Sequence, residues 1–193
     1  MYYADKSTIA TQYDLYYKNG KESLYNKRFG NKSKITIREK SLLRKHLELA
    51  VEVANKEDSK DVKVLDFGCG DGRTLPALYI PALYMPAYDF TIIAYDISQV
   101  GLEELAKNLR SEGFVDHDNN GTNIQNAKFI NKNVTIQLVL GTPEMGAGEL
   151  QNLLGIGFHL VLCLFGVLSH IPGSENRLEI IKMFHKILVK DAL

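Results

Sequence analysis

The sequence has little of what marks secreted, metal-binding or membrane proteins. It holds two cysteines, Cys69 and Cys163, too few for a disulfide framework or a cysteine metal site. Its first residues form no apolar segment of the kind found in secretory signal peptides. The longest apolar run, residues 155–168, is interrupted by His159 and is shorter than the roughly 18 residues that a membrane span needs. The sequence therefore predicts a cytoplasmic protein without a membrane partner.

The chain also has no net charge, because 23 basic residues balance 23 acidic ones. A broad electrostatic attraction to nucleic acid or anionic lipid is therefore not expected. The exception is local: residues 1–34 carry seven basic and three acidic residues, and six of the ten tyrosines. We interpret residues 1–37 as a basic, tyrosine-rich arm before one domain, residues 38–193. The arm would either close over a ligand or pack on the domain surface.

Helix and strand patterns alternate along the rest of the chain. Apolar residues recur at helical spacing in residues 38–55, 99–112 and 174–189, the last with Ser174 as its expected N-cap. Apolar runs typical of strands occupy residues 62–67, 91–96, 134–140 and 160–168. This alternation predicts an α/β fold with a doubly wound, mainly parallel sheet.

A five-residue repeat follows the first predicted strand. Residues 76–80 (PALYI) are repeated as residues 81–85 (PALYM), and a third proline stands at position 86. A proline inside a helix removes a hydrogen bond and clashes with the preceding turn, at a cost of about 3 kcal/mol. We therefore expect the first helix after this strand to be broken or shortened.

The first predicted strand leads into a glycine-rich turn. Asp66 lies at the strand end, and glycines follow at alternate positions, Gly68, Gly70 and Gly72. Glycine lets the backbone turn sharply and lets a ligand approach closely. The first strand-to-helix turn of a doubly wound sheet is also where nucleotides bind. Asp96 ends the next strand, where a carboxylate can accept hydrogen bonds from both ribose hydroxyls.

These segments resemble class I S-adenosylmethionine-dependent methyltransferases, which have a Rossmann-like sheet. Residues 64–72 (VLDFGCGDG) resemble the first motif of that family, residues 94–98 (AYDIS) its second, and residues 158–163 (FHLVLC) its fourth strand. A nicotinamide oxidoreductase fits less well, because the dinucleotide fingerprint needs a glycine where Arg73 stands.

The resemblance implies S-adenosylmethionine as the cofactor and assigns residues to it. Asp66 would hold the methionine amino group, the glycines would lie against the methionine part, Asp96 would bind the ribose, and Ile97 would pack on the adenine. Glu144, like Thr142, equally fits a surface loop. The full implied set is Asp66, Gly68, Cys69, Gly70, Gly72, Asp96, Ile97, Glu144, Leu164 and Phe165, the last two of which equally fit the core.

The segment after the fourth strand resembles those that carry histidines in methyltransferases acting on small molecules and on tRNA wobble uridines. His170 is therefore the candidate catalytic base, with bonding of the loop backbone as the alternative role. His159, where family members often have aspartate, is interpreted as a substitution at the start of the strand. Zero net charge favours a small-molecule acceptor, and the basic arm keeps tRNA open. Nothing in the sequence indicates a metal.

The resemblance implies a seven-stranded sheet in the order 3-2-1-4-5-7-6, of which the sequence supplies 3-2-1-4. Strands 5-7-6 are expected to be missing, which leaves the fourth strand as an edge open to self-association or to a partner chain. The expected function is S-adenosylmethionine-dependent methyl transfer to an unidentified acceptor. The alternative is a truncated, non-catalytic cofactor-binding remnant, or one piece of a split methyltransferase.

Overall fold

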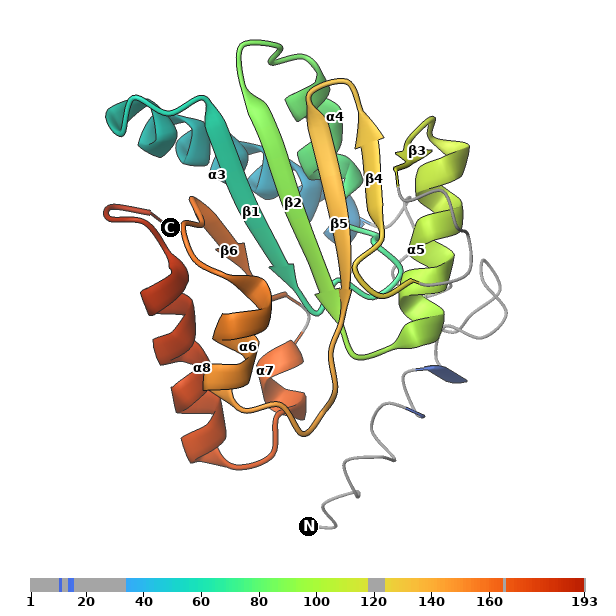
Figure 1. The fold of residues 1–193 in the computed structure, drawn as a ribbon, viewed down its shortest axis with the longest axis vertical. Coiled ribbons are helices and arrows are strands. Elements are labelled where there is room, and N and C mark those ends of the chain that lie inside the picture. The colour runs from blue at the N-terminus through green and yellow to red at the C-terminus, as the bar shows by residue number, and fades with distance from the viewer. Residues whose placement is uncertain (1–10, 12–13, 16–33, 118–123, 165, 193) are drawn as a thin grey trace.

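The computed structural model describes residues 11, 14–15, 34–117, 124–164 and 166–192. In them a six-stranded sheet has helices on both faces (Figure 1). The strands are β1 (Asp61–Phe67), β2 (Asp89–Asp96), β3 (Val115–Asp116), β4 (Lys128–Asn131), β5 (Val134–Leu140) and β6 (Leu160–Leu162). The helices are α3 (Lys34–Lys56), α4 (Pro76–Leu83), α5 (Gln99–Ser111), α6 (Ala147–Leu154), α7 (Val167–His170) and α8 (Ser174–Ile187). The predicted doubly wound α/β fold is confirmed.

The strand order is β3-β4-β5-β2-β1-β6, and β5, β2, β1 and β6 run parallel. These four strands are the ones predicted from the sequence, so the predicted order 3-2-1-4 is confirmed. β3 and β4 add an antiparallel edge beside β5 that the sequence analysis missed. Among the described residues, no further strand follows β6 in the sheet.

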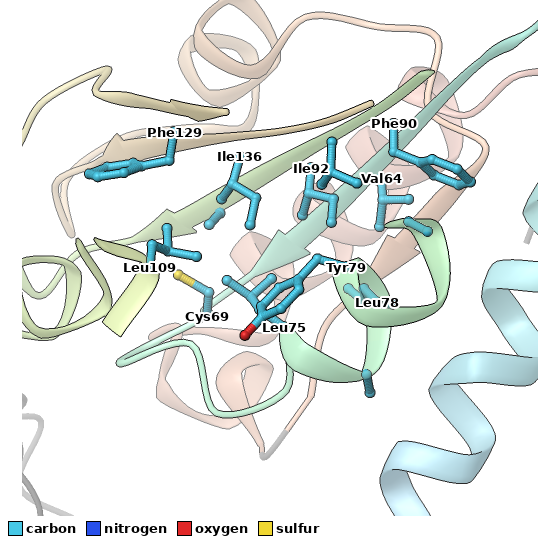
Figure 2. Close-up of a cluster of buried hydrophobic side chains, with 14 of the residues drawn as sticks. Val64, Cys69, Leu75, Leu78, Tyr79, Phe90, Ile92, Leu109, Phe129 and Ile136 are labelled. Atoms are coloured by element: carbon cyan, nitrogen blue, oxygen red, sulfur yellow. The ribbon is translucent and has the colours of Figure 1, made fainter. Parts of the chain in front are cut away.

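The two faces of the sheet bury alternate side chains of the same strands. Val64 and Ile92 face α3, α4 and α5 in one cluster, which Figure 2 shows in close-up. Leu65 and Ile93 face the opposite side and pack with α6 and α8. Each fully buried aliphatic side chain contributes about 1.5–3 kcal/mol of transfer free energy. Burial on both faces explains why the parallel strands are apolar almost throughout.

The proline repeat shortens α4 as predicted. Pro76 occupies the first turn, Pro81 lies inside the helix, and the helix ends at Leu83 before the third proline. The two copies of the repeat differ in burial. Tyr79 of the first copy is 4% exposed and meets the Phe114 ring edge-on at 5.1 Å, whereas Tyr84 of the second copy is 82% exposed.

The fourth predicted strand is shorter than expected. β6 ends at Leu162 rather than at residue 168, because Gly166 takes the left-handed φ of 75° and the following residues form α7. Next to β6, Phe158 pairs in parallel with Leu188, and Val189 N–H donates to the Phe158 carbonyl at 2.9 Å. Part of the predicted open edge is therefore covered from within the chain, and association through the remainder stays a prediction.

Two further differences concern helix ends. α8 begins at Ser174, but its N-cap is Gly173, so the prediction of Ser174 as the cap was wrong. The sequence analysis also missed α6, whose start is stabilised by a hydrogen bond from Gly146 N–H to Glu149 Oε2 at 2.9 Å. Of the predicted arm, all six tyrosines lie outside the described residues. α3 begins at Lys34, earlier than the helix predicted at residues 38–55. The boundary between the arm and the domain at residue 37 stays a prediction.

Candidate functional site

The glycine turn follows β1 at the carboxyl edge of the parallel strands. The turn has positive φ values at all three glycines: 85° at Gly68, 57° at Gly70 and 77° at Gly72. L-residues rarely adopt this backbone region. A Cβ atom at Gly68 would collide with Val167 of α7, and one at Gly72 would collide with Leu105 of α5. Both the backbone conformation and the close packing therefore require glycine here.

Backbone hydrogen bonds tie this turn to the end of β2. The N–H groups of Gly68 and Cys69 donate to the Tyr95 carbonyl at 2.8 and 3.0 Å. The N–H group of Gly70 donates to Asp96 Oδ2 at 2.7 Å. The Cys69 side chain points into the core cluster instead of toward the turn's surface (Figure 2). Any contact of Cys69 with a ligand would therefore involve its backbone.

Asp96 lies buried at the end of β2. Its Oδ1 accepts a hydrogen bond from Ser98 N–H at 2.8 Å, and its Oδ2 accepts the one from Gly70. Burial raises the pKa of Asp96, and the N–H groups of Ser98, Gly70 and Ile97 oppose that rise by favouring the ionised form. The bonds from Ser98 and Gly70 use two of the roughly four acceptor positions of a carboxylate, so acceptor capacity remains for hydroxyl donors of a ligand.

Asp66 lies beside it on β1, paired with Ala94 of β2 and almost fully buried. Thr74 Oγ1 donates to Asp66 Oδ2 at 3.1 Å. Burial raises the pKa of Asp66 to about 7; repulsion from Asp96 adds to the rise, while the Thr74 bond and the Arg73 charge oppose it. Two acids buried this close together favour a ligand that brings positive charge and hydrogen-bond donors.

An ion pair joins the glycine turn to α3. Arg73 lies 3.0 Å from Glu39, and their side chains are 5% and 25% exposed. This pair holds the residue after the last glycine against the N-terminal helix. In the sequence, Arg73 is informative only because it replaces the third glycine of a dinucleotide fingerprint. Glu39 carries no sequence signal, because the pairing depends on how α3 packs.

The start of α5 completes the site. Ser98 is the N-cap, and its Oγ accepts a hydrogen bond from Gly101 N–H at 3.0 Å. The same Oγ donates to Asp14 Oδ1 at 2.7 Å, and Val100 N–H reaches that oxygen at 3.3 Å. A serine directly before a predicted helix is a readable N-cap signal that the sequence analysis did not use. Asp14, 84 residues away in the sequence, carries no such signal.

The remaining predicted cofactor residues are spread around this centre. Ile97 and Leu164 are half-buried, each packed beside one of the two core clusters. Glu144 and Thr142 are exposed in the segment that follows β5. Phe165 lies outside the described residues. The structure thus brings together Asp66, the glycine turn and Asp96, and the cofactor-binding role of all these residues stays a prediction.

The two histidines singled out from the sequence lie on opposite sides of β6 in the chain, and so toward opposite ends of the parallel strands. His170 ends α7, is exposed, and stands one helical turn after Val167, whose side chain packs on Gly68. His159 directly precedes β6 at its amino end, where its Nδ1 accepts a hydrogen bond from Lys63 N–H at 3.0 Å. The buried His159 therefore binds backbone, whereas His170 lies on the side of the glycine turn.

The described residues also bear on whether the chain has a metal site or a membrane span. In that part of the chain, no three histidine, cysteine, aspartate or glutamate side chains are grouped so that they could hold a metal ion. None of the helices there is both long and apolar enough to cross a membrane.

The sequence matches no protein-family model and no curated protein. Solved structures do match. An S-adenosylmethionine-dependent methyltransferase from Clostridium acetobutylicum aligns with a TM-score of 0.51 and 17% identity, over 88% of this chain and 52% of its own. This chain has the class I methyltransferase fold.

Other structures with the class I methyltransferase fold align less closely. The plantazolicin methyltransferase BpumL, in complex with SAH, gives a TM-score of 0.47 at 14% identity, over 96% of this chain and 57% of its own. MnmC2 from Aquifex aeolicus gives 0.46 at 12% identity, over 81% and 48%. The chain spans about half the length of these matched proteins.

Proposed function

We propose that the chain binds S-adenosylmethionine and directs transfer of its methyl group to an acceptor. The observation that carries the proposal is the glycine turn with two buried acids, Asp66 and Asp96, at the ends of adjacent parallel strands. The class I methyltransferase fold supports it. When bound, S-adenosylmethionine supplies an activated methyl group on a positively charged sulfonium.

The residues present fit this ligand. Asp96 keeps acceptor capacity beyond its bonds to Gly70 and Ser98, which suits ribose hydroxyls. Asp66 suits an ammonium group, because a cation beside it would favour the ionised form that burial disfavours. The backbone at Gly68 and Gly70 has no Cβ to block a close approach. Ile97 and Leu164 are proposed to pack against the adenosine.

The chemistry asked of the protein is modest. Holding two reactants in line and excluding water supplies much of the barrier reduction for a displacement reaction. A base is needed only where the acceptor must lose a proton, and His170 is the proposed group because α7 packs on the glycine turn. We propose a small-molecule acceptor, with tRNA as the alternative.

Calorimetric titration of the full chain with S-adenosylmethionine tests the proposal. Saturable binding is expected, and Asp96→Asn should weaken it at least about tenfold, since hydrogen bonds to a charged group contribute about 1.5–3 kcal/mol each. Asp89→Asn is the matched control, because Asp89 is exposed at the opposite end of β2. A folded chain that shows no saturable binding would refute the proposal.

The acceptor class is tested by the SAH formed when a small-molecule extract or bulk tRNA is added. A signal that ribonuclease abolishes would select tRNA. The described residues offer no observation that favours the non-catalytic alternative, and SAH formation with either acceptor pool would exclude it. The cytoplasm is the proposed compartment, since both Cys69 and Cys163 are unpaired.

A further inference from the structure

Ser98 connects two carboxylates that come from distant parts of the chain. Its N–H donates to Asp96 Oδ1 at 2.8 Å, and its hydroxyl donates to Asp14 Oδ1 at 2.7 Å. The hydroxyl oxygen also accepts the N–H of Gly101 at 3.0 Å. Ser98 is fully buried, and its backbone donor, hydroxyl donor and hydroxyl oxygen are all used. Its position is therefore fixed by both acids together.

Asp14 makes a second contact with the same helix end. Its Oδ1 accepts Val100 N–H at 3.3 Å, in the first turn of α5, where backbone donors lack partners within the helix. A carboxylate is favourable there, because the N-terminus of a helix carries partial positive charge. The Asp14 charge also raises the pKa of Asp96, so the two carboxylates are within electrostatic range of each other.

The first turn of α5 packs directly on the glycine turn. A Cβ atom at Gly101 would lie 3.2 and 3.3 Å from the carbonyl carbon and oxygen of Gly70. Gly70 N–H in turn holds Asp96 Oδ2 at 2.7 Å. A shift of this helix end would therefore disturb both hydrogen bonds that orient the Asp96 carboxylate, the one from Ser98 and the one from Gly70.

We propose that Asp14 is a positioning residue of the nucleoside site. By holding Ser98 and Val100, it keeps the start of α5 in the place where Asp96 presents its remaining acceptor positions to a ribose. The inference rests on the proposed function and assigns part of the site to the segment that precedes the domain. Binding of the nucleoside and docking of Asp14 then strengthen each other, as linkage requires.

The test is calorimetric titration of the full chain with S-adenosylmethionine, with a thermal melt of every variant. Asp14→Ala should raise the Kd about five- to tenfold, the expected effect of losing a charge-assisted hydrogen bond. Ser98→Ala should have a similar effect, and the loss in the double variant should be less than the sum of the two single losses, because both changes break the bond between Ser98 and Asp14. Asp14→Asn keeps an acceptor oxygen without the charge and should recover part of the affinity, because a neutral hydrogen bond is weaker than a charge-assisted one. Glu52→Ala, an exposed acid on α3, is the control and should bind normally.

The outcomes separate this inference from the function on which it rests. If the unaltered chain binds S-adenosylmethionine and Asp14→Ala binds it equally tightly, the positioning role is overturned and the proposed function is left intact. Fully additive losses in the double variant, or an Asp14→Asn variant as weak as Asp14→Ala, also overturn it. A lowered Tm with an unchanged Kd would assign Asp14 to stability alone. No binding by the unaltered chain overturns both.

Discussion

Replacing Asp66 with asparagine should make the fold more stable and the site weaker. Burial, with repulsion from Asp96, raises the pKa of Asp66 to about 7, whereas the same group in an unfolded chain titrates near about 4. Between these two values the native protein binds one proton that the unfolded chain does not. Stability conferred by this group is therefore greatest at low pH and is lost as the pH rises toward 7.

The size of the effect follows from the two pKa values. As the pH rises from 5 to 8, ionisation of this carboxyl lowers the free energy of unfolding by about 2–3 kcal/mol. The Asp66→Asn side chain keeps an acceptor for Thr74 but has no charge to bury. The difference in free energy of unfolding between the variant and the unaltered protein should therefore grow by about 2–3 kcal/mol from pH 5 to pH 8. Its affinity for S-adenosylmethionine should fall about tenfold, because the charge proposed to hold the ammonium is gone.

Urea unfolding at pH 5 and pH 8 measures the difference. Asp61→Asn is the matched control, since Asp61 is exposed at the other end of β1, and it should change neither stability nor its pH dependence. Asp96 titrates in both proteins, so the comparison cancels most of its contribution. A stability difference between Asp66→Asn and the unaltered chain that is equal at the two pH values would show that Asp66 is already ionised at pH 5, and would refute the reasoning.

Three further predictions, each tested by urea unfolding, concern the packing around the site. Gly68→Ala should destabilise by at least about 1 kcal/mol, because a Cβ meets α7 at a left-handed φ, whereas Gly148→Ala in open space on α6 should stabilise slightly. Tyr79→Ala should cost about 2–4 kcal/mol and Tyr84→Ala under about 0.5 kcal/mol, and equal losses would contradict the unequal burial of the two repeats. Arg73→Ala should cost about 3 kcal/mol or more, since it removes the cation paired with the largely buried Glu39 of α3. A loss below about 1 kcal/mol would show that solvent screens the pair.

Much of the fold could be predicted because its central strands are covered on both faces. The strand at residues 134–140 was predicted with the bounds that β5 has, since strong apolar character continues to its ends. The glycine turn was equally readable, because its positive φ values restrict the residue type to glycine, and Asp66 stands two residues before its first glycine. The pattern failed after residue 162, where the apolar run continues past the strand while Gly166 turns the backbone into α7.

The features that were missed depend on contacts between distant segments. β4 has four residues and is defined by its pairing with β5 across a two-residue connection, in which Lys132 has a φ of 52°. Without glycine, that connection gives no hairpin signal. Asp14 reaches α5 across 84 residues, and Glu39 meets Arg73 across 34. No periodicity in a single sequence encodes such pairings.

The exposed second copy of the proline repeat offers a place to attach a probe. Tyr84 is the C-cap of α4, in the segment between α4 and the amino end of β2, whereas the glycine turn follows the carboxyl end of β1. The positions of α4, β1 and β2 are shown in Figure 1. The two native thiols are poorly reactive, because burial raises the pKa of Cys163 to about 11 and holds that of Cys69 well above its usual range. A Tyr84→Cys variant would therefore accept a fluorophore selectively while both native cysteines stay in place. Such a labelled chain would allow ligand binding to be followed in the intact protein.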